Sequence, residues 1–439
     1  MKNAYTNLLF CLLLTSVGFA QNIDKEKLDK YFNTIDSNNK FMGSVVVAKK
    51  GRVIYSKTIG YADIEKNIKA IENTKYRIGS ISKTFTAVLI MKAVELGKIK
   101  LNQSIHRFFP TVKNAKKITV SNLLNHRSGI PNFTSKSDYL TWNTEFKSEK
   151  EMIKLIAESG SDFEPDSKAA YSNSNYVLLT YILEKTFKKN YNELLEEHIL
   201  QPLELNDTYL GKKINPENNE CKSYKYIGSW KEEAETDISI PLGAGGIVSS
   251  AKDLTKFIEG LFSEKIIQKE QLTMMTTLKD NYGMGLFQFP FDEKKAWGHT
   301  GGIDGFTSVL SFFPDDSISY ALLSNGINYN NNDISITVLS AIYEKPFTIP
   351  EFKYFEINSS DLDKYLGEYS SAQLPIKINI TKEGKTLIAQ ATGQPSFSLE
   401  AIEKDKFKFE QAGIVLEFIP SDDTMILNQG GGKFSFTKN

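Results

Sequence analysis

Two blocks of strand-forming residues lie far apart in this chain and enclose a mostly helical middle. The first block holds two β-branched runs, 43–48 and 53–56, around a turn that contains a glycine. The second block holds apolar runs at 305–313 and 318–323. Such pairs of runs predict β-hairpins. Because helical patterns fill the interval 80–262, we expect one antiparallel sheet built from both ends of this region and packed by helices, an α/β (α+β) sandwich.

Several segments show the apolar spacing of helices. Residues 23–37 predict an amphipathic helix, because their apolar side chains recur every three or four positions. The other helical segments are expected at 123–131 (a helix end and turn), 176–187, 191–199 and 334–343.

The character of the chain changes after the proline-containing segment 345–350. From Leu362 onward, short β-type runs alternate with turns, which predicts a separate small antiparallel β domain, either a barrel or a sandwich. Its strands are expected at 376–380, 386–391, 407–409 and 414–419. The resulting division is a main domain at 21–347, a linker at 348–361 and the β domain at 362–439. The β domain contains no Cys or His, so its role is either structural cover or a lid that selects substrate.

The N-terminus has the pattern of a secretory signal. Lys2 supplies positive charge, Leu8 to Val17 an apolar core, and Gly18-Phe19-Ala20 a cleavage site, so residues 1–20 are predicted to be a signal peptide. The apolar run is shorter than the ~20 residues that a membrane-spanning helix needs. We therefore expect an exported protein, periplasmic or secreted, with no membrane span in its mature form. Cys221 is then its single cysteine, which excludes an internal disulfide.

The charges of the chain are balanced. Lys+Arg and Asp+Glu both number 53, so neither nucleic acid nor an anionic membrane surface is an expected partner. The histidines lack helical ligand spacing, so no metal and no cofactor are expected; they are His106, His126, His198 and His299. A partner must therefore be inferred from a site. The sequence predicts no oligomeric state.

Ser80 and Lys83 stand at the start of a long apolar run that ends at Gly97. In a helix that begins near Ser80, residues i and i+3 share a face, so hydroxyl and amine can meet. A neutral amine activates a serine as its base, and burial favours the neutral form by lowering the pKa of the lysine. The same spacing recurs, as a chance arrangement on a solvated surface, at Ser37/Lys40, Ser249/Lys252 and Ser435/Lys438. Only the Ser80 copy precedes a long apolar helix with a glycine stop.

Tyr171-Ser172-Asn173 is expected on a loop before a helix. A phenol near Lys83 can relay a proton, provided that the positive charge lowers its pKa. Asn173 can hold Lys83 with its oxygen and donate to a substrate carbonyl.

His299-Thr300-Gly301-Gly302 follows a strand-like run. Glycines there let a substrate backbone approach the strand edge. The backbone N–H groups of Gly302 and Ser80 can then form the oxyanion hole that acyl transfer needs.

In this order, Ser80-x-x-Lys83, Tyr171-x-Asn173 and His299-Thr300-Gly301 resemble the motifs of the serine β-lactamase and penicillin-binding protein superfamily, especially its class C-like branch. The resemblance runs from Phe41 to Tyr343 and implies a β-lactamase/transpeptidase-like sandwich whose sheet takes strands from both chain ends. It implies Ser80 as the acylated nucleophile and Lys83 with Tyr171 as the general base pair. The implied substrate-binding residues are Asn173, His299, Thr300, Gly301 and Gly302.

Two positions depart from the family pattern. Class C β-lactamases carry lysine where this chain has His299, and a lysine is a permanent cation for the carboxylate of the drug. A histidine with a pKa near ~6.5 is mostly neutral at pH 7, and family members with histidine here resemble D-peptidases and esterases more than β-lactamases. Arg127 replaces a threonine common in the family's His-Thr-Ser-Gly turn, and His126 beside it is expected to be structural.

The resemblance implies an exported serine hydrolase that acts through a Ser80 acyl-enzyme. Its expected substrates are D-amino-acid peptides, peptidoglycan stems or small esters and amides, so its type is D-alanyl-D-alanine carboxypeptidase, D-aminopeptidase or esterase. One alternative is a β-lactamase that hydrolyses β-lactam antibiotics. The other is a penicillin-binding or ligand-sensing protein that is acylated without turnover.

Overall fold

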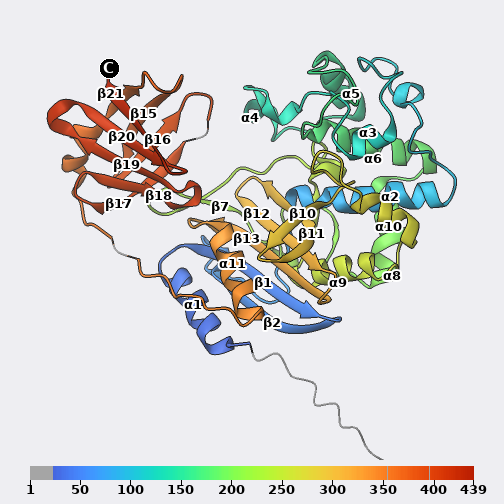
Figure 1. Cartoon of the computed structure of the whole chain (residues 1–439), viewed down its shortest axis with the longest axis horizontal. Helices are drawn as coiled ribbons and strands as arrows, with labels where there is room; N and C mark the ends of the chain where they lie inside the picture. The colour runs from blue at the N-terminus through green and yellow to red at the C-terminus, as the bar shows by residue number, and fades with distance from the viewer. Residues whose placement is uncertain (1–22, 353, 395) are drawn as a thin grey trace, which may run out of the picture.

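The computed structural model describes residues 23–352, 354–394 and 396–439; the predicted signal peptide at 1–20 lies outside the described residues. The main sheet has eight strands, and its main path runs β10-β11-β12-β13-β1-β2 with every neighbour antiparallel. β1 (Phe41–Lys49) pairs with β13 (Ile318–Ile327) from end to end. In Figure 1 these strands, blue and orange, lie side by side. The predicted sheet from both ends of the main region is confirmed.

The remaining strands complete this sheet and two small ones. The main path also holds β2 (Arg52–Ile59), β10 (Phe287–Phe291), β11 (Lys294–Ile303) and β12 (Phe306–Phe313). At its side, β7 (Tyr224–Tyr226) pairs with β13 and with β8 (Trp230–Glu232). One small sheet joins β3 (Tyr61–Asp63) to β4 (Ile68–Lys69), and the other has the order β5 (Tyr76–Arg77), β9 (Ile247–Ser249), β6 (Tyr209–Leu210).

The sheet is covered on both faces because side chains alternate across a strand. On β13, Tyr320 and Leu322 join one apolar cluster with helices α1 (Lys25–Ser37) and α11 (Asn331–Ile342). Their neighbours Ala321 and Leu323 join the other cluster, with the helical region. The helices predicted at 23–37 and 334–343 are confirmed.

The helical region is built around α2 (Ser82–Glu95), which is buried on nearly every side. A helix that is apolar all round belongs in a core. The other helices are α3 (Val120–Leu124), α4 (Tyr139–Trp142), α5 (Glu149–Glu158), α6 (Asn173–Phe187), α7 (Tyr191–Leu195), α8 (Gln201–Leu203), α9 (Ala251–Phe262) and α10 (Lys269–Thr276). The predicted helix at 191–199 leaves α geometry after Leu195 and continues as a π-helical turn. None of the helices in the described ranges has both the length and the apolar character needed to cross a membrane.

The C-terminal β region is a closed barrel rather than a sandwich. Its eight strands pair in chain order, and the first also pairs with the last. They are β14 (Gly367–Ser370), β15 (Lys377–Glu383), β16 (Thr386–Ala391), β17 (Phe397–Glu403), β18 (Lys406–Phe409), β19 (Ile414–Ile419), β20 (Thr424–Gln429) and β21 (Gly432–Lys438). Tyr365, Phe407 and Phe418 pack together inside it. The barrel stands beside the main sheet, in red at the upper left of Figure 1.

A buried ion pair joins the barrel to the main sheet. Lys40, immediately before β1, is 1% exposed, and its Nζ lies 2.5 Å from a carboxylate oxygen of Glu400 on β17. The side-chain amide of Asn328 donates to the same carboxylate at 2.6 Å. The expectation of a solvated Lys40 is therefore wrong, because its partner lies 360 residues further along the chain.

Replacing Glu400 with alanine is expected to lower the free energy of unfolding by about 3 kcal/mol, because the change leaves a buried charge without its partner. Denaturant unfolding measures this loss. Glu368→Ala is the matched control, since Glu368 pairs with Lys377 on the surface, where both side chains are about half exposed; that loss should stay below about 1 kcal/mol. Equal losses in the two variants would contradict the assignment.

Candidate active site

Ser80 lies in a tight turn between β5 and α2. The helix begins at Ser82, and residues Gly79–Ile81 form a 3-10 turn before it. Gly79 has φ +50, and a Cβ added to it would lie 2.7 Å from the backbone nitrogen of Gly302. Only glycine accepts both this backbone conformation and this close approach. The turn therefore places the Ser80 segment directly against β11.

The Lys83 amine contacts three oxygen atoms. Its Nζ lies 2.9 Å from Ser80 Oγ, and it donates to Asn173 Oδ1 at 2.7 Å and to the Ala244 carbonyl at 2.6 Å. Both carbonyl-type oxygens can only accept hydrogen bonds. A neutral amine has two N–H groups and one lone pair. Since the two N–H groups point to Asn173 and Ala244, the lone pair is left for the Ser80 hydroxyl.

Burial sets the charge of Lys83. The side chain is fully enclosed, and this burial lowers its pKa well below the usual 10.5. No carboxylate in the described part of the chain pairs with it to oppose the shift. The neutral amine, which is the form that can accept a proton, is therefore favoured.

Tyr171 lies beside this pair. Its ring centroid is 4.9 Å from Lys83 Nζ, and its phenol interacts with the Ser80 side chain. Burial raises the pKa of Tyr171, and the contact with Ser80 offsets this only in part. The sequence-based condition of a lowered phenol pKa is thus not met, because a neutral Lys83 supplies no positive charge. Tyr171 stays protonated at neutral pH.

Two neighbours hold the 171–173 segment in place. The His126 ring lies 4.5 Å from the Tyr171 ring, and His126 Nδ1 accepts the backbone N–H of Ser172 at 3.2 Å. Asn173, the first residue of α6 rather than a loop residue, donates its side-chain amide to Thr134 Oγ1 at 3.0 Å. That bond directs the Asn173 oxygen toward Lys83. These contacts support the prediction that His126 has a structural role.

β11 presents an open edge to Ser80. β10 pairs with β11 only as far as Gly298, so in the described chain no strand pairs with this edge beyond that residue. The nucleophile turn packs there: a Cβ added to Gly301 would lie 2.1 Å from the carbonyl oxygen of Ile78. Thr300 is exposed on the same strand. The free edge and the Gly302 amide beside Ser80 provide room for an extended acyl group.

His299 is buried beneath this edge. It is 2% exposed, its Nδ1 donates to the Thr300 carbonyl at 2.6 Å, and its ring faces the rings of Phe287 and Tyr171. Burial lowers its pKa to about 3. The imidazole is therefore neutral at physiological pH, as the sequence predicted, and it supplies no cation to the site.

Acid is expected to destabilise the protein through His299. The unfolded histidine has a pKa near ~6.5, while the folded value is about 3, so between these values the unfolded state binds more protons. Stability then falls as pH drops below ~6.5, by about 2 kcal/mol at pH 5 for this one group. Denaturant unfolding between pH 5 and pH 7 should show a smaller dependence in His299→Asn. The same dependence in both proteins would contradict the prediction. His126 and His198, whose pKa values burial also lowers, contribute in the same direction.

Ser80 opens into a cavity of about 650 Å³. From β11 the cavity is lined by Gly302 and Ile303, followed by Asp304 and Gly305 of the next turn. The space therefore extends from the nucleophile toward the far end of this strand. Its other walls include Phe133, Tyr139, Asn173, Glu233, Thr236 and, from the barrel, Gln411. Gln411 Nε2 also donates to the Ile327 carbonyl at 2.5 Å, which places the barrel at the rim of the cavity.

The structure thus brings Ser80, Lys83, Tyr171 and Asn173 together beside the 299–302 segment. Sequence reasoning missed the Ala244 carbonyl, since a backbone oxygen has no residue-type signature. Arg127 does not enter the site: its side chain pairs with Asp166 and Asp280 and anchors the loop that precedes Tyr171. Among the described residues, no group of three or more His, Cys, Asp or Glu side chains is placed to hold a metal ion.

Two features define the β-lactamase/transpeptidase-like class of proteins. One is an antiparallel sheet with strands from both ends of the main region, and the other is a serine and a neutral lysine at the N-terminus of a buried helix. The chain belongs to the Beta-lactamase family, whose model matches residues 33–341. It is therefore a hydrolase of the serine β-lactamase family.

Relatives of this chain include penicillin-binding proteins and a teichoic acid D-alanine hydrolase. Penicillin-binding protein 4* of Bacillus subtilis is 24% identical over 93% of this chain and 97% of its own length. Teichoic acid D-alanine hydrolase of Staphylococcus aureus is 30% identical over 55% of this chain and 59% of its own length.

Solved structures show the same fold. D-amino acid amidase from Ochrobactrum anthropi aligns with a TM-score of 0.63 and 25% identity, over 72% of this chain and 99% of its own. The octameric penicillin-binding protein homologue from Pyrococcus abyssi aligns with a TM-score of 0.66 and 25% identity, over 94% of this chain and 100% of its own. The second alignment includes most of the barrel region, since it covers nearly the whole chain.

Proposed function

We propose that this chain is an exported serine hydrolase that acts through an acyl-enzyme on Ser80, with D-aminoacyl esters and amides, including D-alanyl peptides, as its substrates. The observation that carries the proposal is the geometry of Lys83. Its Nζ donates to Asn173 and Ala244 and lies 2.9 Å from Ser80 Oγ, so a neutral amine has its lone pair left for the Ser80 hydroxyl. That arrangement is what a general base for a serine nucleophile requires.

In the proposed reaction, Ser80 Oγ gives its proton to Lys83 Nζ and attacks the substrate carbonyl carbon. The oxyanion that forms accepts hydrogen bonds from the N–H groups of Ser80 and Gly302. Tyr171 donates its phenol proton to the leaving amine or alcohol and takes one from the Lys83 ammonium, which restores both groups. Water then gives a proton to Lys83 Nζ and attacks the ester carbonyl carbon. As the intermediate collapses, the bond to Ser80 Oγ breaks, Oγ takes the proton back from the Lys83 ammonium, and the acid is released.

Two observations favour a D-aminoacyl substrate over a β-lactam. The relatives named for D-amino acid amidase and teichoic acid D-alanine hydrolase activity share the fold or the sequence of this chain. The neutral His299 offers no cation to the carboxylate of a β-lactam. Export is proposed from the signal pattern at 1–20.

The test is steady-state hydrolysis of D-alanine p-nitroanilide, its L-enantiomer, p-nitrophenyl acetate and nitrocefin by the purified mature chain, with Ser80→Ala as control. The proposal predicts faster turnover of the D- than of the L-anilide, all of it lost in the control. Nitrocefin as the best substrate would instead establish a β-lactamase. A burst without a steady state on every compound would establish an acylated binding protein.

A further inference from the structure

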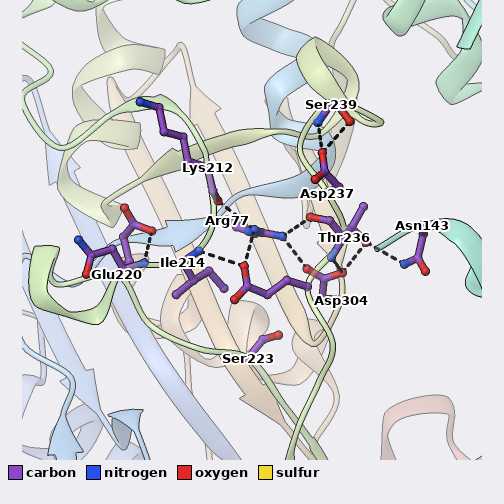
Figure 2. A network of polar contacts seen from close by, with 12 residues as sticks. Arg77, Asn143, Lys212, Ile214, Glu220, Ser223, Thr236, Asp237, Ser239 and Asp304 are labelled. Carbon is purple, nitrogen blue, oxygen red and sulfur yellow. Dashed lines mark hydrogen bonds and ion pairs between the residues drawn. The ribbon is translucent and has the colours of Figure 1, made fainter. Parts of the chain in front are cut away.

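A buried guanidinium lies three residues before Ser80. Arg77, on β5, is 3% exposed and donates four hydrogen bonds. The acceptors are the carbonyls of Thr236 at 2.8 Å and Lys212 at 3.1 Å, Asp304 Oδ2 at 3.0 Å and Glu235 Oε2 at 3.0 Å. Figure 2 shows this side chain at the centre of a polar network that joins several loops.

Asp304 is the second fixed point of the network. It lies in the turn between β11 and β12, two residues after Gly302, and its side chain is 2% exposed. Besides Arg77, its carboxylate accepts the backbone N–H of Thr236 at 3.0 Å and the Thr236 hydroxyl at 2.6 Å. All three bonds hold the tip of the β11–β12 hairpin (Figure 2).

The network also reaches the opposite wall of the cavity. Asn143, immediately after α4, donates its side-chain amide to the Thr236 hydroxyl at 3.0 Å. Its backbone carbonyl accepts the backbone N–H of Asp237 at 2.8 Å. Asn143, Thr236 and Asp304 all line the cavity that contains Ser80. One chain of contacts therefore links the nucleophile strand, the hairpin tip, the 233–239 segment and the helical region.

We propose that the Arg77–Asp304 ion pair is a positioning device for the oxyanion hole and the adjoining cavity wall. This inference rests on the proposed function. Arg77 precedes Ser80 and Asp304 follows Gly302, so the pair ties together the two segments whose N–H groups face the oxyanion. Gly79 and Gly302 are already in backbone contact. The ion pair prevents the hairpin tip from swinging away from that contact.

The energetics point to function rather than to stability. The attraction within a buried ion pair often offsets only part of the free energy lost when the two charges leave water. Apolar residues of similar size often stabilise a protein as well or better. Arginine is required here because its planar fork serves four acceptors at once, which a lysine ammonium with three donors on a flexible stem cannot do. Arg77 acts through the backbone and touches no reacting atom, so it is a positioning residue.

The test uses the full mature chain with Arg77→Lys, Asp304→Asn and the milder Thr236→Val. The substrate-independent probe is a fluorophosphonate, whose phosphoryl oxygen occupies the oxyanion hole as Ser80 is labelled. Glu400→Gln, in the buried pair with Lys40, is the matched control. Thermal unfolding of each protein gives its folded fraction, and p-nitrophenyl acetate hydrolysis gives kcat and KM.

The labelling rate and kcat of Arg77→Lys and Asp304→Asn are expected to fall about 10- to 100-fold. This is less than the roughly 10²- to 10³-fold loss for a removed oxyanion donor, because the donors are displaced rather than removed. KM of these two variants should change less than about threefold. The labelling rate and kcat of Thr236→Val should lie between theirs and those of the wild type. Glu400→Gln should keep the wild-type rates. Folded Arg77 and Asp304 variants with wild-type rates would overturn the inference, as would rates that follow the folded fraction alone. A wild-type chain that the probe does not label would overturn the proposed function itself.

Discussion

Ser80→Ala is expected to abolish turnover of every ester and amide substrate, by at least about 10⁴-fold in kcat. Without the hydroxyl there is no nucleophile, and the remaining catalysis comes from the oxyanion hole and from binding alone. Hydrolysis of p-nitrophenyl acetate measures the effect, and product binding to the variant should persist because the cavity walls are unchanged.

The control for this change is Ser37→Ala. Ser37 belongs to another Ser-x-x-Lys pattern but lies exposed at the end of α1. Its loss should leave kcat unchanged. Residual turnover in Ser80→Ala near the wild-type level would show that a different group attacks the substrate.

Lys83→Met is expected to lower kcat/KM by about 10²- to 10⁴-fold, the range for a lost general base. The methionine fills similar space but has no lone pair on nitrogen to take the Ser80 proton. The wild-type rate should fall as pH drops through the lowered pKa of Lys83, because protonation removes the base. The residual rate of the Lys83→Met variant should not show this decrease at low pH.

The melting temperature of the Lys83→Met variant distinguishes a loss of the base from a loss of folded protein. Lys83 is buried, and no carboxylate among the described residues pairs with it. Replacing its amine with an apolar group should therefore leave the melting temperature equal to or above that of the wild type. Lys83→Arg tests the same point differently, since arginine stays charged and cannot act as a base. Either variant with wild-type kcat/KM would contradict the role of Lys83.

The sequence predicted those features that local periodicity or residue type can reveal. The contact between Ser80 and Lys83 follows from i, i+3 spacing near the start of a helix. The sheet follows from two hairpin patterns and the helices between them. The neutral state of His299 follows from its ordinary pKa, although burial carries the shift much further than residue type alone indicates.

The missed features depend on tertiary contacts between distant segments. The Ala244 carbonyl that directs the Lys83 amine lies 161 residues away. Arg77 and Asp304 are 227 residues apart, and each looks like an ordinary surface charge in its own segment. The sequence also could not decide between a barrel and a sandwich for the C-terminal domain. A barrel closes only when β14 pairs with β21, and no local sequence pattern encodes that pairing.

The most direct test of the account is intact-mass analysis of the mature chain after reaction with a fluorophosphonate, followed by peptide mapping. The account predicts one adduct per chain, located on Ser80 and absent from Ser80→Ala. An adduct on any other residue, or no adduct on a folded protein, would contradict it.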